Sequence, residues 1–329
     1  MKTDDNVSSG YDLSFAYDGT LEGFFALLDR LWNGALPEER WPRRVLRSAA
    51  PGGGTQGLLF DEGPLPAASP AEAPVPPALL PEAAVLGPTA GILFQVSAEA
   101  YDALVCVWMS GLPLEGAALR YALRVLGAAK RAAAASGPAS APAAGRPWYC
   151  REEARHGAAG AARNRADEDC RTVLALSYKV AHEIDRLMGF LRFSPDVRGR
   201  YVARCAPDYR ILPALAPHFS ERFGDAPWAI VDEKRGLVLA GEGRGELRLS
   251  AIEAAAGPKA PGTGDCAGPS PQGRSAPEPW EELWRSYHRA VNIDDRKNLS
   301  LQRRFVPLRY RDYLDEFSPS VPPSTGDCN

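Results

Sequence analysis

Residues 211–252 have the sequence ILPALAPHFSERFGDAPWAIVDEKRGLVLAGEGRGELRLSAI, and they predict the class of the fold. The first part, Ile211–Phe223, has apolar side chains at helical spacing, which predicts a helix with one buried face. Short apolar runs follow it, and the stretch Asp232–Gly236 is typical of a tight turn between two strands. This order favours an antiparallel sheet with helices packed against it, and therefore an α+β fold. The predicted strands are Trp228–Val231, Leu237–Ala240 and Glu246–Ile252.

The residues before this stretch extend the same plan. GFLRFS from Gly189 and RYVARCAP from Arg200 predict a hairpin around a turn at Asp196–Gly199. The apolar period of Arg171–Met188 predicts an amphipathic helix. Near the N-terminus, Asp12–Tyr17 alternates as a strand does, and the polar residues after it predict a turn followed by a helix with Thr20 as its N-cap and Leu21 as its first apolar residue.

The middle of the chain predicts a strand at Gly91–Val96, then a helix capped by Ser97 and a second helix from Leu114 to about Lys130. Glycine, proline and alanine dominate three other stretches, which we predict to be flexible insertions at about 49–88, 128–168 and 254–279. A continued helix is the alternative for the alanine-rich tract within 128–168. We expect one domain over residues 11–329 to carry these insertions.

The bulk composition limits the class of protein. The 329 residues carry a formal net charge of -3 and are 45% hydrophobic, which is ample for a core. No stretch has the ~20 apolar residues that a membrane span needs, and the N-terminus has no apolar signal segment, so we expect a soluble, cytoplasmic protein. The six cysteines lack the C-x-x-C spacing of metal clusters, so no metal and no other cofactor is expected.

The C-terminal stretch Arg296–Arg311, RKNLSLQRRFVPLRYR, concentrates positive charge, because it holds six Lys and Arg residues and no acid. Basic side chains interleaved with aromatic rings and amides are the composition expected of a surface that binds phosphate, so DNA is the first partner to consider. A solvated helix face that pairs with nearby acids is the alternative. The candidate DNA-binding residues are Arg296, Lys297, Asn298, Gln302, Arg303, Arg304, Arg309 and Tyr310.

Several strings resemble those of one family. From Trp280, the string WEELWRSYHRAVNIDDRKNLSLQRRFVPLRYRDYL is similar to the C-terminal signature of DUF4130, a bacterial family of unknown function that is usually described as a probable DNA metabolism or DNA repair protein. YDGT from Tyr17, EGF from Glu22, GFLRF from Gly189 and the stretch Ile211–Gly236 occur in the family's order. The resemblance is specific for the family, and none of the strings is a catalytic motif.

The resemblance implies partners rather than a reaction. Members of the family resemble partners of a radical-SAM protein thought to act on DNA, and in some bacteria the domain is fused to a uracil-DNA-glycosylase-like domain. We therefore expect an accessory protein that binds DNA and works with a radical-SAM or glycosylase-like partner. The chain itself has no string typical of a glycosylase, so the partner's activity is not assigned to it.

His182, Asp185 and His218 are the candidate catalytic residues. His182 and Asp185 lie three residues apart on one predicted helix, so an imidazole and a carboxylate can meet there, as general acid–base chemistry requires. His218 lies off the apolar face of its helix and can point into a cleft. The alternatives are an ordinary surface pair and a partly buried helix residue. The family's usual string resembles E-A-H-R, which matches Glu183 and Arg186 but has histidine where this chain has Asp185.

The turn formed by Tyr17, Asp18, Gly19 and Thr20 resembles a ligand loop only in placing one glycine before a helix, since the further glycines and the lysine of a Walker loop are missing. The sequence is consistent with a DNA-binding accessory protein, with a stand-alone nuclease or nucleotide-modifying enzyme, and with a protein–protein adaptor. A cleft that gathers the candidate residues would favour the enzyme, a basic face would favour binding, and an exposed apolar patch would favour the adaptor.

Overall fold

The computed structural model describes residues 15–47, 82–135, 147–243, 246–252, 299–311 and 313–314, together with six positions between 283 and 293. Contacts divide the chain into two compact units. The first unit includes the described residues up to Glu183 and Asp208–Ile211, and the second includes Ile184–Pro207 and the described residues from Leu212 onward. Because compact units of one chain can fold together or apart, the single domain expected over residues 11–329 stays a prediction.

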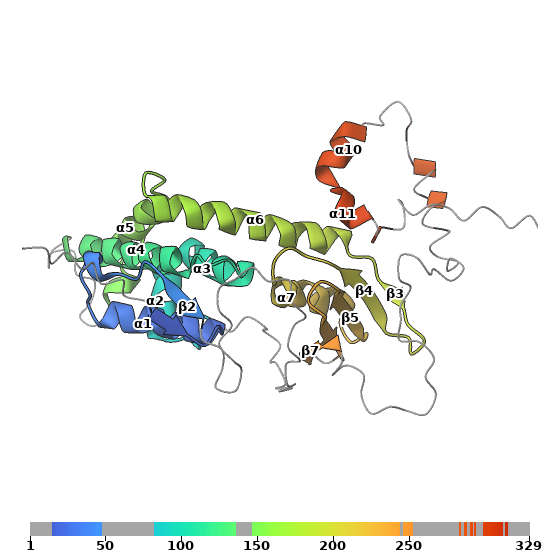
Figure 1. The fold of residues 1–329 in the computed structure, drawn as a ribbon, viewed down its shortest axis with the longest axis horizontal. Coiled ribbons are helices and arrows are strands. Elements are labelled where there is room, and N and C mark those ends of the chain that lie inside the picture. The colour runs from blue at the N-terminus through green and yellow to red at the C-terminus, as the bar shows by residue number, and fades with distance from the viewer. Residues whose placement is uncertain are drawn as a thin grey trace, which may run out of the picture. The chain divides into compact units, whose positions relative to one another are not determined.

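The first unit begins with a strand, a turn and a helix, as predicted (Figure 1). β1 (Phe15–Tyr17) pairs in parallel with β2 (Val45–Arg47), and α1 (Leu21–Asn33) follows β1 directly. Thr20 is the N-cap of α1, because its side-chain oxygen accepts a hydrogen bond from the Gly23 amide. Helical spacing of the apolar residues then buries one stripe, which consists of Leu21, Phe24, Phe25, Leu27, Leu28 and Leu31.

The predicted strand at Gly91–Val96 is wrong, because these residues belong to α2 (Pro88–Val96). A short apolar run cannot be distinguished from a buried helix by its pattern alone, and here contacts with α1 and α3 favour the helix. Ser97 caps α3 (Ala98–Ser110) as predicted, and Gly111 ends that helix in the left-handed conformation. The side chains of α2 that are buried against the neighbouring helices are Thr89, Ala90, Leu93 and Val96.

The flexible insertion predicted at about 128–168 is wrong wherever the structure describes it. α4 (Glu115–Ala135) continues through its first residues, and η3 (Trp148–Cys150) and α5 (Glu152–Ala162) follow. α5 packs along α4, and a Cβ atom on Gly157 would lie only 2.6 Å from the Cβ atom of Ala132. Small residues therefore build a close helix pair here instead of a linker. The α5 alanines Ala154, Ala158 and Ala162 are fully buried.

The other two predicted insertions fall mainly outside the described residues. Residues 136–146, 48–81 and 253–282 are not described, so the predictions for 49–81 and 254–279 stay predictions. The last part of the first insertion, residues 82–88, is described, and Ala83 and Leu86 are buried there. The end of that stretch therefore contributes two side chains to the core of the first unit.

α6 (Glu168–Phe190), predicted as Arg171–Met188, runs from the first unit into the second. The second unit contains a five-stranded sheet in the order β3-β4-β5-β6-β7. α7 (Leu212–Phe223) lies between β4 and β5 in the chain and contacts β5 and β6. The strands are β3 (Ser194–Pro195), β4 (Tyr201–Cys205), β5 (Trp228–Asp232), β6 (Leu237–Gly241) and β7 (Leu247–Ala251).

The α+β class is confirmed, and the sheet is mostly antiparallel. β4 and β5 are its parallel pair, because α7 returns the chain to the starting edge before β5 begins. The predicted hairpin of β3 and β4 is present, as are the antiparallel pairs β5–β6 and β6–β7. Aromatic rings fill the space between α7 and the sheet, with the Phe219 and Trp228 centroids 6.1 Å apart.

The C-terminal part of the second unit contains α10 (Leu299–Phe305) and α11 (Leu308–Arg311), drawn in red in Figure 1. Both are short, and a loop at Val306 and Pro307 separates them. Within the described part of the chain, no helix is long and apolar enough to cross a membrane.

Candidate functional site

α11, at the end of the basic segment Arg296–Arg311, packs on the second unit through an aromatic contact. Tyr310 is 2% exposed, and its ring centroid lies 5.7 Å from that of Phe190, the last residue of α6. Leu314 is also buried. These two side chains therefore anchor α11 on the second unit.

Arg304 and Arg309 are exposed around this anchor. The Arg309 guanidinium carbon lies 4.8 Å from the centre of the Tyr310 ring, and Nη2 of the same guanidinium donates a hydrogen bond of 2.9 Å to the Tyr310 hydroxyl. This contact orients the guanidinium while leaving the side chain at the surface. Of the other predicted DNA-binding residues, Gln302 and Arg303 lie on α10 with side chains outside the description, and Arg296, Lys297 and Asn298 lie outside the described residues.

Tyr310 is buried, whereas a ring that stacks on a base needs an exposed face. Phe190 and Arg309 lie against it, and a ring that is 2% exposed has no free face for a base. Large apolar side chains of α10 and α11 are also exposed, namely Leu301 at 48%, Phe305 at 60% and Leu308 at 70%. The segment thus presents both positive charge and apolar surface.

The predicted pair His182 and Asp185 lies on the exposed side of α6. Instead of meeting Asp185, the His182 ring stacks on Tyr178, with ring centroids 5.8 Å apart and an interplanar angle of 16°. Among the described residues, the His182 imidazole and the Asp185 carboxylate share no hydrogen bond or ion pair. His182 belongs to the first unit and Asp185 to the second, although one helix carries both.

His218 lies on α7 in the second unit and is partly buried, with its ring edge against Phe219 at 4.8 Å between centroids. Asp232, the first residue of the predicted turn, is fully buried at the end of β5. The Asp232 carboxylate accepts hydrogen bonds from the Arg235 amide and guanidinium, which closes the β5–β6 turn. Both carboxylate oxygens of Asp232 therefore stabilise the turn.

Glu183, which matches the family string, is a buried acid on α6. Its two carboxylate oxygens accept hydrogen bonds from the backbone amides of Asp208 and Tyr209, at 2.9 and 3.0 Å. Glu183 is 3% exposed, so these bonds compensate the cost of burying a charge. This residue ties the loop before α7 to the first unit, and its role is structural.

The turn Tyr17–Thr20 also has its polar groups occupied within the protein. The Asp18 carboxylate accepts hydrogen bonds from the Thr20 hydroxyl and amide, which lower the pKa of that carboxyl. Gly19 has φ +82°, and its carbonyl oxygen accepts a hydrogen bond from the Trp108 indole. The predicted ligand loop therefore acts as a cap and a packing contact.

The Tyr17 hydroxyl donates a hydrogen bond of 3.2 Å to Glu115, which lies in the first turn of α4 and is 2% exposed. Arg47 of β2 pairs with the same carboxylate at 2.5 Å. Burial raises the pKa of Tyr17 to about 12, so this hydroxyl stays protonated and remains a donor. The three side chains connect β1, β2 and α4.

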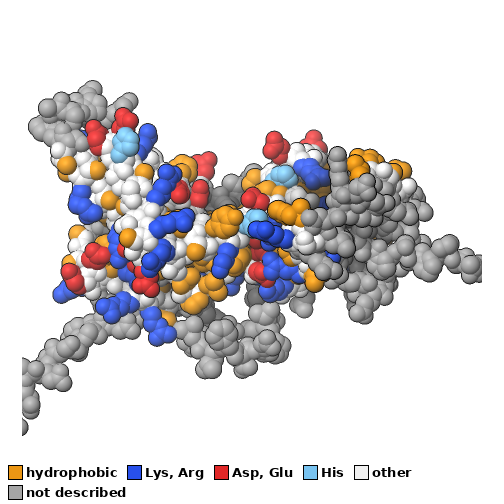
Figure 2. Space-filling view, turned by 90° about the horizontal axis from the view of Figure 1, so that it is seen from above, with side chains coloured by type: hydrophobic (Ala, Val, Ile, Leu, Met, Phe, Trp, Pro, Cys, Tyr) orange, Lys and Arg blue, Asp and Glu red, His pale blue; other side chains and the backbone are white. Residues whose placement is uncertain are grey.

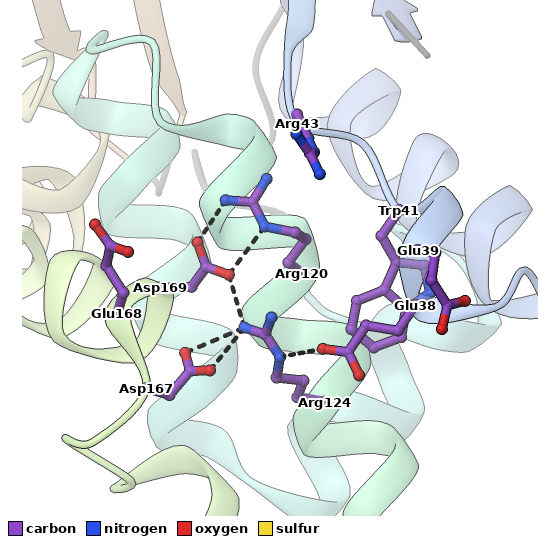
Figure 3. A pocket seen from close by; sticks show the side chains of 9 residues that line it. All are labelled: Glu38, Glu39, Trp41, Arg43, Arg120, Arg124, Asp167, Glu168 and Asp169. Carbon is purple, nitrogen blue, oxygen red and sulfur yellow. Dashed lines mark hydrogen bonds and ion pairs between the residues drawn. The ribbon is translucent and has the colours of Figure 1, made fainter. Parts of the chain in front are cut away.

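A cavity of about 450 Å³ opens in the first unit where η1 (Glu38–Arg40), α4 and the start of α6 meet (Figure 3). Two arginines on one face of α4 cross it and bind acids on its far side. Arg120 makes a two-point contact with Asp169, and Arg124 pairs with Glu38, Asp167 and Asp169. The lining residues are Glu38, Glu39, Trp41, Arg43, Arg120, Arg124, Asp167, Glu168 and Asp169.

The charges of this cavity do not suit phosphate. Five acids and three arginines line it, and the guanidinium donors of Arg120 and Arg124 are used by carboxylates and by the Pro42 carbonyl. Burial raises the pKa of Asp169, but the hydrogen bonds and positive charges of the two arginines outweigh this and hold the pKa below its usual value. The ion-pair network joins η1, α4 and the start of α6. None of the predicted site residues lines the cavity.

The sequence did not predict that Glu115, Asp169 and Glu183 are buried, because their neighbours in the chain do not distinguish them from surface acids. The partners of Glu115, Asp169 and Glu183 lie between 25 and 98 positions away in the chain. Asp167 is the exception, since its carboxylate caps α6 by accepting from the Cys170 amide three residues later. That local spacing is the kind of signal a sequence can show.

Comparison with known proteins gives one family. The family model described as a domain of unknown function, DUF4130, matches residues 150–316, which is half of the chain. No curated protein and no solved structure matches the chain.

Proposed function

The chain belongs to the DUF4130 family, and we propose that it is a nucleic-acid-binding accessory protein of DNA metabolism or repair. The observation that carries the proposal is the arrangement of the basic segment. Tyr310 and Leu314 are buried and hold α11 in place, whereas Arg304 and Arg309 are exposed. Arginines presented on an anchored element fit the phosphate contacts by which proteins position DNA without reading its sequence.

The resemblance to the family adds a partner to the proposal. According to this proposal, the protein brings DNA to a radical-SAM protein or to a uracil-DNA-glycosylase-like protein, and that partner carries out the reaction. The exposed apolar side chains of α10 and α11 support a protein contact beside the basic residues, since Phe305 and Leu308 are 60% and 70% exposed. An adaptor role is therefore part of the same proposal.

A stand-alone enzyme has less support. His182 and Asp185 are exposed on α6, His218 packs against Phe219, and none of them lines the cavity of the first unit. A catalytic site normally gathers its reacting groups in a concave pocket. We therefore place the chemistry on the partner.

The experiment is a binding titration over a range of salt concentrations. Purified full-length protein is mixed with a fluorescently labelled DNA duplex, and binding is followed by anisotropy. Changing Arg303, Arg304 and Arg309 together to alanine should weaken binding to every sequence and reduce the slope of log K against log salt by about 2–3, because each phosphate contact contributes about 0.9.

The matched control removes the same charge from other exposed positions of the second unit, by changing Arg198, Arg222 and Arg248 to alanine. This variant should keep the wild-type slope. Equal affinity and slope in the wild type and the first triple variant would show that DNA binds elsewhere, and a wild type that binds no DNA would contradict the proposed function.

A further inference from the structure

The solvent face of α6 presents an aromatic pair. Tyr178 is 71% exposed, and its ring stacks on that of His182 at an interplanar angle of 16°. With 5.8 Å between the centroids, the two rings are offset, so they lie nearly parallel without covering each other. Together they form an exposed pair of aromatic rings on the outside of the first unit.

Two of the three exposed charged side chains nearest this pair on α6 are basic. The exposed charged side chains of α6 nearest the pair are Arg171 and Lys179, which are basic, and Asp185, which is acidic and lies three residues after His182. The other acid near the pair, Glu183, is buried, and both of its oxygens accept backbone hydrogen bonds. Figure 2 views the face of the molecule along which α6 runs and shows basic, acidic and apolar side chains side by side.

We propose that this face of α6 binds single-stranded nucleic acid, with a base stacked on Tyr178 and His182 and with Arg171 and Lys179 contacting phosphates. Aromatic rings beside basic side chains are the combination by which proteins hold single strands without reading sequence. The inference rests on the proposed function and adds to it the form of nucleic acid and a surface separate in sequence from the basic segment.

The geometry selects an unpaired strand over a duplex. The bases of a duplex stack on one another, so a side chain on the convex surface of a helix reaches a base face only when that base is unpaired or extruded. The Tyr178 ring projects from a helix surface, where it can meet a splayed base but cannot enter a stacked pair. Binding should therefore depend on the ring for single strands and not for duplexes.

The test compares labelled single strands of about 15 nucleotides, as DNA and as RNA, with the corresponding DNA duplex. Tyr178→Ala should weaken single-strand binding by about tenfold, which is the scale of one lost stacking contact. The salt slope of this variant should equal that of the wild type, because stacking releases no counterions. Tyr178→Phe keeps the ring and should bind like the wild type. Lys179→Ala should lower the slope for single strands by about 0.7.

Phe94→Ala is the control, since Phe94 is another exposed aromatic side chain of the first unit, 48% exposed on α2. It should leave single-strand binding unchanged.

Wild-type affinity in Tyr178→Ala, or an equal loss for single strands and duplex, would overturn the α6 proposal. If Tyr178→Ala weakens single-strand binding while the triple variant of the basic segment is unaffected, the α6 surface stands and the proposed role of the basic segment falls. A wild type that binds no nucleic acid overturns both.

Discussion

At the scale of single residues, four acids are buried in the described part of the chain, and each accepts hydrogen bonds. Their partners are arginine side chains, a tyrosine hydroxyl or backbone amides. A buried carboxylate without partners would cost several kcal/mol, so these acids stabilise the fold through their contacts. The acids are Glu115, Asp169, Glu183 and Asp232.

The contribution of Asp169 to stability should depend on pH. Its pKa in the folded state lies below the usual 3.8, so its stabilisation is complete above about pH 4 and is lost as the pH falls through the folded-state value. Asp169→Asn should lower the free energy of unfolding by about 3 kcal/mol at pH 7. The difference from the wild type should shrink below about pH 4, as measured by chemical or thermal unfolding from pH 7 to pH 3.

Glu168→Gln is the control for this prediction, because Glu168 is the exposed neighbour of Asp169 in the chain. Its effect should stay within about 0.5 kcal/mol at every pH. A difference between Asp169→Asn and the wild type that stays constant down to pH 3 would mean that the pairing with Arg120 and Arg124 contributes nothing to the acid sensitivity.

Two glycines of α5 form a matched pair for a second prediction. A Cβ atom at Gly157 would lie 2.6 Å from the Ala132 Cβ atom and 2.8 Å from the Ala128 carbonyl oxygen, whereas nothing lies within 4 Å of one at Gly160. Gly157→Ala should therefore destabilise the protein by about 1–3 kcal/mol through overpacking. Gly160→Ala should stabilise it by about 0.5–1 kcal/mol, because alanine favours the helix. Denaturant midpoints measure both, and equal effects would refute the close α4–α5 contact.

At the scale of elements, α5 is part of the core of the first unit. It buries three alanines against its neighbours, and Tyr121 of α4 donates a hydrogen bond to the Ala162 carbonyl. Replacing Glu152–Ala162 with a Gly/Ser linker of equal length should cost about 2 kcal/mol, at about 0.8 kcal/mol for each buried methyl group. The melting temperature should fall by roughly 4–8 °C. An unchanged melting temperature would mean that α5 contributes no stability.

The position of α11 depends on the burial of Tyr310, as the position of α1 depends on its buried apolar stripe. Tyr310→Ala removes the contact with Phe190 and should release the segment, so that trypsin cleaves after Arg304 and Arg309 at least several times faster than in the wild type. Tyr310→Phe keeps the ring contact and should be cleaved at nearly the wild-type rate. Equal cleavage of all three proteins would show that the ring does not hold the segment.

At the scale of the whole molecule, the candidate proton carriers are distributed over both units, with His182 in the first and His218 in the second. If the partner supplies the chemistry, Asp185→Asn and His218→Gln should each retain DNA binding and partner-dependent repair within about twofold of the wild type. The assay reconstitutes repair with the partner, and thermal melting verifies the fold. Loss of repair in a variant that still binds DNA and melts normally would support an enzyme.

The elements that the sequence predicted correctly depend on nearby residues. The caps at Thr20 and Ser97 act three residues away, and the strands after α7 are separated by short turns, so a local pattern is sufficient to specify them. The concentration of charge in the basic segment is likewise visible in the sequence, because composition does not depend on the fold. These features and the α+β class follow from the order of residues alone.

Only the tertiary structure decided the features whose partners are distant in the chain. α2 and α5 are helices because α1, α3 and α4 bury their small and apolar residues, and neither short apolar runs nor alanine-rich tracts show that such partners exist. Tyr310 is an anchor because Phe190, 120 positions earlier, lies against it. The Tyr178 ring is exposed because its side of α6 faces solvent. Burial depends on what the rest of the chain places nearby, and a residue's neighbours in the sequence do not contain that information.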